Sequence, residues 1–477
     1  MDPLGPSRDR VLRTTAPDPI YFSSLTYYVT LLSHKATGVT MSTRRVLKAV
    51  APALLAGLLP GRLAAAPHLT TLYTFTNGTD GGSPQTGLLA GPNGSLMGAM
   101  LIGGTQGVGS LYQLTPPTGN EKHWHFTNLY SFSNGPTGNE PGALVADNAG
   151  NIYGEANVGG IGCGSVGCGT LFRLSPPVVG KSIWSETTLY QFTGKSDGAN
   201  PFLGLAIDDA GNLFGYSPNG GNGNGTVFEL SLPASGQTSW TLTTLYKFKG
   251  RDDGVSPETV PLLGADGSLY GNATAGGFHR SAECATASYG FGCGLVFRLS
   301  PPTAGQTSWT KTTLHGFLGT DGVSPLSTLV ADASGDLFGL TYGGGLLGDC
   351  APNGQAGNGC GTVFEIRPPA AGQTIWSRTT IWKFTGGRDG AFPDYTALTP
   401  WADGYLATSD SAIILLQPRP GHHLWRASTW HEFTGGKDGT APNGPLLYLN
   451  GSFYGTTQGN LNSNSPSRYG TIFRLDP

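Results

Sequence analysis

Short apolar runs alternate with turn-forming residues along most of the chain. A typical stretch is "LSTLVADASGDLFG" at Leu326–Gly339, in which two apolar runs flank a polar turn. The runs are about four to eight residues long and are bounded by glycine, proline, aspartate or asparagine. Runs of this length and setting predict β-strands joined by tight turns rather than helices.

The predicted strands recur in a fixed order. The segment "LYTF" and its relatives occur seven times, ending at Phe75, Phe132, Phe192, Phe248, Phe317, Phe384 and Phe433. Each copy is followed by a D-G-x-x-P type of turn, an apolar run, a polar turn, the motif G-x-L-Y/F-G, a glycine-rich loop and a phrase such as "GCGTLFRLSPP". Four strands per repeat and seven repeats predict an all-β fold, a seven-bladed β-propeller of four-stranded antiparallel blades.

The residue types also suggest how each blade is ordered. "FLGLAI" at Phe202–Ile207 is apolar and small, which suits the crowded innermost strand A, whereas "WSETTLYQF" at Trp184–Phe192 is rich in Thr and Ser, which suits the outer strand D. This order predicts that an N-terminal strand at Leu69–Phe75 pairs with the last strand, Thr471–Leu475, and closes the ring. The rival order takes "TTLYxF" as the innermost strand and needs no such pairing.

Composition narrows the function classes. The 477 residues include 76 glycines and 34 prolines, which argue against long helices. Only 12% of residues are charged and the formal net charge is −3, so neither nucleic acid nor an anionic membrane is expected as a partner. No motif indicates a cofactor or a metal site.

The N-terminal region has the features of an export signal. After Met41 come a basic segment, an apolar stretch at Ala49–Pro60 and small residues at Ala64–Ala66. We therefore predict a start at Met41 with a mis-assigned segment 1–40, a signal peptide at 41–66 and a single propeller domain at 67–477. The alternative is a membrane-anchoring N-terminus, although the apolar stretch is short for a bilayer span. The mature chain is expected to be periplasmic or extracellular, monomeric and without a membrane span.

The six cysteines form three local pairs: Cys163 with Cys168, Cys284 with Cys293, and Cys350 with Cys360. Each pair lies in the loop between strands B and C of one blade. An even count, local pairing and an export signal favour disulfides. The alternative is zinc, but the pairs lie on different blades and no histidines stand at matching positions.

Two repeated residue types have structural readings. The D-G-x-x-P aspartates are Asp80, Asp197, Asp253, Asp321, Asp389 and Asp438. Six copies around a ring favour turn formation over catalysis, and the spacing of a calcium-binding loop is absent. The repeated tryptophans (Trp124, Trp184, Trp240, Trp309, Trp376 and Trp425) are predicted to pack between blades.

The B–C loops break the sevenfold pattern. They are long in blades 4 and 5, at Ala275–Gly294 and Gly343–Gly361, and nearly absent from blade 6. Loops on a rigid scaffold often carry binding residues, although they also vary without functional cause. The predicted ligand-binding surface, off-centre toward blades 4 and 5, comprises His279, Arg280, Glu283, Tyr289, Phe291, Tyr342, Asp349, Asn353 and Gln355.

The repeat is similar to one known family. The pattern "DG…P…L…D..G.LYG.T..GG…GTVF.L.PP", clearest at Asp197–Leu230 and Asp321–Pro369, resembles the GloVer tandem repeat of secreted bacterial proteins. The resemblance implies export and carries over no ligand or catalytic residue. Two hypotheses follow: a non-enzymatic binding or scaffold module for a glycan or extracellular protein, and a carbohydrate-active hydrolase or lyase. An enzyme should place one unrepeated acid pair or His–Tyr set at the axial mouth.

Overall fold

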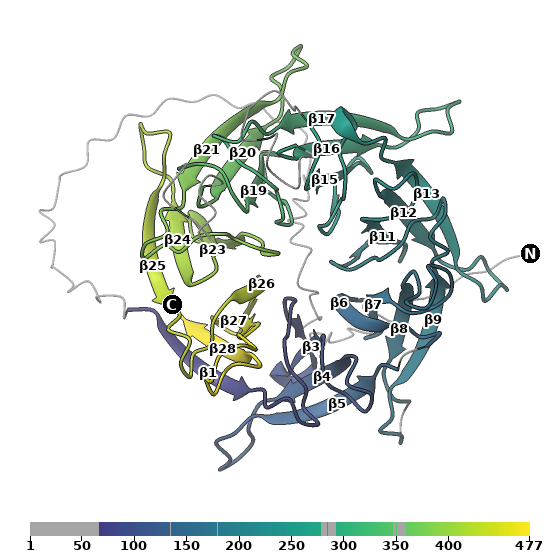
Figure 1. Ribbon diagram of the computed structural model, residues 1–477, viewed down its shortest axis with the longest axis vertical. Coiled ribbons are helices and arrows are strands. Elements are labelled where there is room, and N and C mark those ends of the chain that lie inside the picture. Colours follow the sequence, from purple (N-terminus) through teal and green to yellow (C-terminus); the bar gives the residue numbers. More distant parts are fainter. Residues whose placement is uncertain are drawn as a thin grey trace, which may run out of the picture.

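Seven four-stranded sheets form a closed ring (Figure 1). The computed structural model describes residues 66–133, 135–178, 180–277, 284, 292–346, 350 and 359–477. Within these residues, apart from the loop around Cys284, helix is limited to two 3₁₀ turns, η1 (Pro92–Gly94) and η2 (Arg251–Asp253). The prediction of a seven-bladed, all-β propeller is confirmed. The predicted signal peptide and upstream segment lie outside the described residues.

Each sheet contains the four strands of one blade. Blade 1 has β2 (Leu89–Ala90), β3 (Leu96–Met100), β4 (Ser110–Thr115) and β5 (His125–Ser131); blade 2 has β6 (Asn139–Ala146), β7 (Ile152–Val158), β8 (Thr170–Ser175) and β9 (Ser185–Gln191). Blade 3 has β10 (Ala206–Ile207), β11 (Leu213–Ser217), β12 (Thr226–Ser231) and β13 (Thr241–Lys247); blade 4 has β14 (Leu262–Leu263), β15 (Leu269–Ala273), β16 (Leu295–Ser300) and β17 (Thr310–Gly316).

The remaining three blades follow the same plan. Blade 5 has β18 (Val330–Ala331), β19 (Leu337–Thr341), β20 (Thr362–Arg367) and β21 (Ser377–Lys383); blade 6 has β22 (Thr399–Trp401), β23 (Gly404–Thr408), β24 (Ala412–Gln417) and β25 (Arg426–Glu432). Blade 7 has β26 (Pro442–Leu449), β27 (Ser452–Thr457), β28 (Thr471–Asp476) and, as its outer strand, β1 (His68–Thr74). β1 pairs antiparallel with β28, with His68 opposite Asp476.

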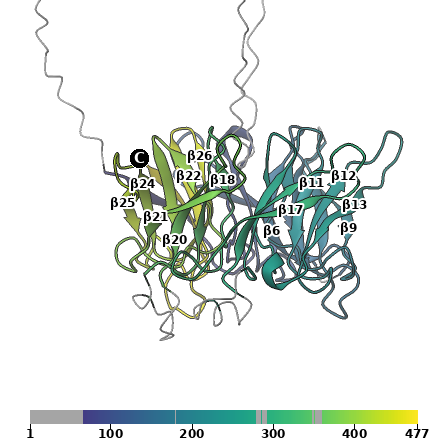
Figure 2. The same ribbon diagram turned by 90° about the horizontal axis from the view of Figure 1, so that it is seen from above.

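The "LYxF" strands form the rim of the ring and the "LLVAD" strands face its centre (Figure 1). Because neighbouring strands are antiparallel, the B–C loops and the D–A connections between blades lie on one face of the disc, called here the disulfide face. The A–B turns and C–D loops lie on the other, the turn face. Figure 2 shows this disc from the side, with the strands running between the two faces.

Aromatic rings join successive blades. The phenylalanine that follows strand D of one blade packs edge-on against the strand C phenylalanine of the next, as Phe132 does with Phe172 at 5.1 Å between ring centroids. Strand C phenylalanines also explain the repeated glycine of strand B: a Cβ on Gly154 would lie 2.6 Å from Cζ of Phe172. The tryptophans pack across blades as predicted; Trp240 of blade 3, for example, contacts Tyr153 of blade 2.

A second junction joins the blades at the disulfide face. The residue before each D-G-x-x-P type proline has a left-handed backbone in all seven blades, from Ser83 to Ala441. In blade 3 this residue is Asn200, and its N–H donates to the carbonyl of Cys168 in blade 2 at 2.7 Å. The next residue, Pro201, packs against Gly169, where a Cβ would lie 2.6 Å from the proline Cδ. The "C-G" of the repeated phrase is therefore a contact between neighbouring blades.

Candidate functional site at the axial cavity

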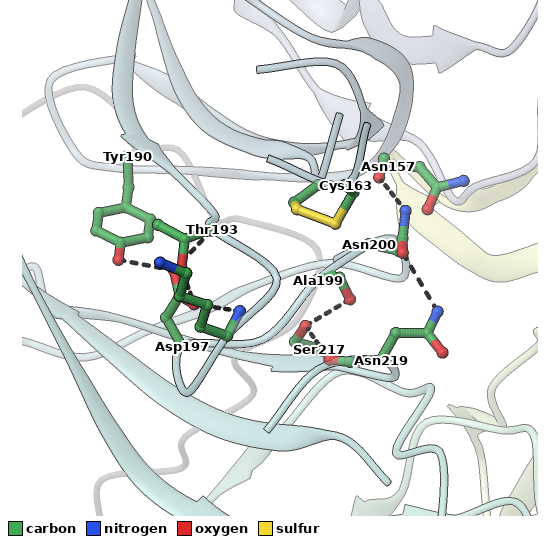
Figure 3. Close-up of a disulfide and its surroundings, with 11 residues drawn as sticks. Asn157, Cys163, Tyr190, Thr193, Asp197, Ala199, Asn200, Ser217 and Asn219 are labelled. Atoms are coloured by element: carbon green, nitrogen blue, oxygen red, sulfur yellow. Dashed lines mark hydrogen bonds between the residues drawn. A yellow bond between two sulfur atoms is a disulfide. The ribbon is translucent and has the colours of Figure 1, made fainter. Parts of the chain in front are cut away.

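The repeated aspartates build the loops around the site and are occupied by that role. Asp197 accepts hydrogen bonds from the Tyr190 hydroxyl at 3.0 Å and from the N–H and hydroxyl of Thr193 at 2.7 and 2.6 Å (Figure 3). Burial by itself raises the pKa of Asp197, but these hydrogen bonds outweigh it and hold the pKa below its ordinary value. The aspartates thus form turns, as their repetition predicts.

All three predicted disulfides are present, joining Cys163 to Cys168, Cys284 to Cys293 and Cys350 to Cys360. The first stands beside the loop of Asp197 in Figure 3. Zinc is excluded as the partner of these sulfurs, and no cluster of three metal-ligating His, Cys, Asp or Glu side chains occurs among the described residues. Three disulfides fit an oxidising, exported environment.

Two adjoining cavities lie where the inner strands meet. The smaller cavity lies on the axis and is lined by residues of all seven blades, from Gln85 in the connection that leads into blade 1 to Pro445 in blade 7. The larger cavity has a volume of about 180 Å³ and extends over blades 2, 3 and 4 toward the disulfide face. Leu203, Glu258, Thr259 and Tyr395 line both cavities. We call the two together the axial cavity.

Glu258 and Asp394 form an unrepeated acid pair at the axial cavity. They occupy equivalent positions, directly after Pro257 in blade 4 and Pro393 in blade 6. The Asp394 side chain still reaches solvent, but the surrounding protein removes much of its hydration and Glu258 carries like charge, so its pKa is raised to about 6. Burial likewise raises the pKa of Glu258, which accepts a hydrogen bond from the Ser256 hydroxyl at 2.8 Å.

A row of amides borders the larger cavity on the side of blades 2 and 3. The Asn157 amide donates to Glu140 at 2.9 Å, the Asn200 amide donates to the Asn157 carbonyl at 3.0 Å, and the Asn219 amide donates to the Asn200 side chain at 3.3 Å. Figure 3 shows Asn157, Asn200 and Asn219 side by side, next to the first disulfide. All three asparagines line the cavity, so they offer hydrogen-bonding groups to a ligand held there.

An aromatic pair lies on the side of blades 5 and 6. The rings of Tyr342 and Phe392 are 5.2 Å apart and tilted by 33°. Phe392 has the left-handed backbone at a position that is Ser, Asn, Glu or Ala in the other blades. Burial raises the pKa of the Tyr342 phenol, and the nearby carboxylates of Asp394 and Asp410 raise it further. The aromatic pair is therefore linked electrostatically to the acid pair.

Of the nine residues predicted to bind a ligand, the structure places only Tyr342. The other eight, His279, Arg280, Glu283, Tyr289, Phe291, Asp349, Asn353 and Gln355, lie outside the described residues. The prediction overlooked the acid pair, Tyr395 and the amide row. A signal was present, since the residue after each turn proline reads Gln85, Gly142, Phe202, Glu258, Leu326, Asp394 and Asn443, with an acid in two blades only.

The chain belongs to a known repeat family. The sequence profile of the Gloeobacter/Verrucomicrobia repeat matches residues 161–412, more than half of the chain. A search of curated protein sequences finds no match. Among the described residues, no helix combines the length and apolar character needed to cross a membrane.

Solved structures with similar folds are distant. An aldose sugar dehydrogenase from Streptomyces coelicolor in its PQQ-bound form is 12% identical, with a TM-score of 0.41, and the match covers 86% of this chain and 98% of that one. An ulvan lyase of polysaccharide lyase family PL25 is 12% identical, with a TM-score of 0.47, covering 82% and 92%. A Trichoderma reesei enzyme of carbohydrate-active family AA12 is also 12% identical, with a TM-score of 0.39, covering 82% and 97%. These likenesses concern the fold and carry no argument about chemistry.

Proposed function

We propose that the protein is an exported, periplasmic or extracellular binding module that holds a carbohydrate at the axial cavity. The observation that carries the proposal is the departure from the repeat around this cavity: amides on the side of blades 2 and 3, carboxylates beside the axis and an aromatic pair on the side of blades 5 and 6. Sugars have hydroxyl groups that pair with amides and carboxylates, and apolar faces that stack on aromatic rings.

Titration calorimetry of the exported protein with a panel of soluble oligosaccharides tests this proposal. We expect one class to bind, and we expect a variant carrying Tyr342→Ala with Asn219→Ala to bind it at least about tenfold more weakly. The matched control is Gln306→Ala in a C–D loop of the turn face, which should leave binding unchanged. Absence of binding to every saccharide, or equal loss in the control, would contradict the proposal.

The acid pair supports a second candidate, a glycan hydrolase or lyase. Glycan hydrolysis commonly uses two carboxyl groups, one of which remains protonated because its pKa is raised, and Asp394 has such a pKa. Release of reducing ends from the bound saccharide, lost in Glu258→Gln and Asp394→Asn, would favour this candidate. Binding without release favours the binding module.

A further inference from the structure

The acid pair has no compensating positive charge among the described residues. Neither Glu258 nor Asp394 takes part in any ion pair of the described chain. Their polar partners are the Ser256 hydroxyl and the backbone N–H of Tyr395. Two like charges that face a common cavity repel each other, and a bound cation relieves that repulsion. The axial cavity is thus electrostatically suited to a positively charged group.

A buried hydroxyl independently indicates a ligand at the same place. Thr259 follows Glu258, lines both cavities and is only 3% exposed. Its Oγ1 has no hydrogen-bond partner in the part of the chain that the structure describes, and the same holds for Oγ1 of Thr86, which lines the smaller cavity. Buried polar atoms are nearly always paired, so these hydroxyls point to a group that occupies the cavity.

The size and lining of the cavity favour an organic cation over a metal ion. Its larger part, about 180 Å³, far exceeds the space of one water, roughly 30 Å³. Phe202, Tyr216 and Tyr395 contribute aromatic surface to the lining. A calcium ion takes about six to eight oxygen ligands, more than the two carboxylates offer. An ammonium group instead presents three donors and is attracted to aromatic faces.

We propose that the axial cavity takes a saccharide residue bearing a protonated amino group, held by Glu258 and Asp394 and by the hydroxyl of Thr259. This inference rests on the proposed carbohydrate-binding function and deepens it. The carboxylates and the hydroxyl would accept hydrogen bonds from the ammonium group, while the cavity aromatics would cover the sugar ring. Acidic saccharides, which carry carboxylate or sulfate groups, would be repelled by the same acid pair.

Calorimetry at neutral pH tests the inference with three oligosaccharides of equal length: a glucosamine oligomer, its N-acetylated counterpart and a uronic acid oligomer. We expect the full exported protein to bind the glucosamine oligomer at least about tenfold more tightly than the acetylated one, a difference of about 1.4 kcal/mol, and to bind the uronic acid oligomer least. The double variant Glu258→Gln with Asp394→Asn should lose this preference and keep its affinity for the acetylated oligomer. Asp209→Asn, an exposed acid on the turn face, is the matched control and should keep the preference.

Each contrary outcome has its own meaning. Equal binding of the glucosamine and acetylated oligomers overturns the amino-sugar inference and leaves the proposed function intact. Failure of every oligosaccharide to bind overturns both. Binding of calcium chloride alone that depends on Glu258 and Asp394, without binding of the glucosamine oligomer, makes the cavity a metal site and also overturns the inference. Far-ultraviolet circular dichroism of each variant checks that the propeller is folded.

Discussion

At the scale of single residues, Glu155 places a titratable group where the fold excludes water. Its side chain in β7 is fully buried, and Oε2 accepts a hydrogen bond from the N–H of Gly204 in blade 3 at 2.7 Å. Oε1 has no partner among the described residues. Burial raises the pKa of Glu155 from its ordinary 4.5 to about 8, so the folded protein keeps this carboxyl protonated at pH values where the unfolded chain has lost the proton.

Glu155 should therefore make stability depend on pH. Because the folded state binds more protons than the unfolded state, the free energy of unfolding should fall as pH rises from about 4.5 toward 8, by up to about 1.4 kcal/mol per pH unit. Glu155→Gln keeps an acceptor for Gly204 and should remove this contribution. Urea unfolding across the range measures it, with Glu229→Gln as control; identical slopes in the wild type and Glu155→Gln would refute the assignment.

At the scale of elements, the contact between neighbouring blades depends on a glycine against a proline. Gly169 has φ +92°, and a Cβ there would lie 2.6 Å from Pro201 Cδ and 2.7 Å from the Ala156 carbonyl oxygen. Gly236 offers a matched comparison, since its φ is +82° and nothing lies within 4 Å of its Cβ position. The two positions share the backbone strain and differ in the contact.

Alanine substitutions at these two glycines should separate strain from contact. Gly236→Ala should cost about 1–2 kcal/mol, the cost of a left-handed backbone for a residue with a Cβ. Gly169→Ala should cost at least about 1 kcal/mol more, because blades 2 and 3 must move apart. Chemical denaturation measures both free energies of unfolding. Equal losses would show that the close packing of proline on glycine contributes nothing to the blade contact.

At the scale of the whole molecule, the seventh blade combines strands from both ends of the described chain. β1 supplies the outer strand against β28, and Phe75 just beyond β1 is fully buried against Tyr112 of blade 1. Removal of β1 would expose the backbone edge of β28 together with this aromatic contact. Exposed strand edges invite pairing with other chains.

Deletion of residues up to Thr76 should therefore lower the thermal unfolding temperature and cause aggregation that increases with protein concentration. Calorimetry and light scattering measure these two effects. A synthetic peptide spanning residues 68–76, added to the truncated protein, should partly restore the unfolding temperature, since it can pair with β28. A truncated protein that unfolds at the wild-type temperature without aggregating would show that this strand is dispensable for the ring.

Much of the fold could be predicted from the sequence because the repeat presents each local signal seven times. The number of blades, the four strands of each, the disulfide partners and the turn role of Asp197 all rest on residues close together in the chain. Turn residues, strand periodicity and local cysteine pairs act over a few residues, so their consequences are legible without coordinates. The site could not be predicted in the same way, and of its proposed members Tyr342 alone lies in the described structure.

What the tertiary structure decided is which side chains meet at the axis. Glu258 and Asp394 are separated by two blades of sequence, and only closure of the ring points both toward one cavity, with Thr259 and Tyr395 between them in its lining. Burial and like charge then raise the pKa of Asp394, effects that depend on surrounding atoms and not on sequence neighbours. The sequence by itself determined a repeated scaffold through local interactions, whereas the chemistry of its centre arises from distances between residues far apart in the chain.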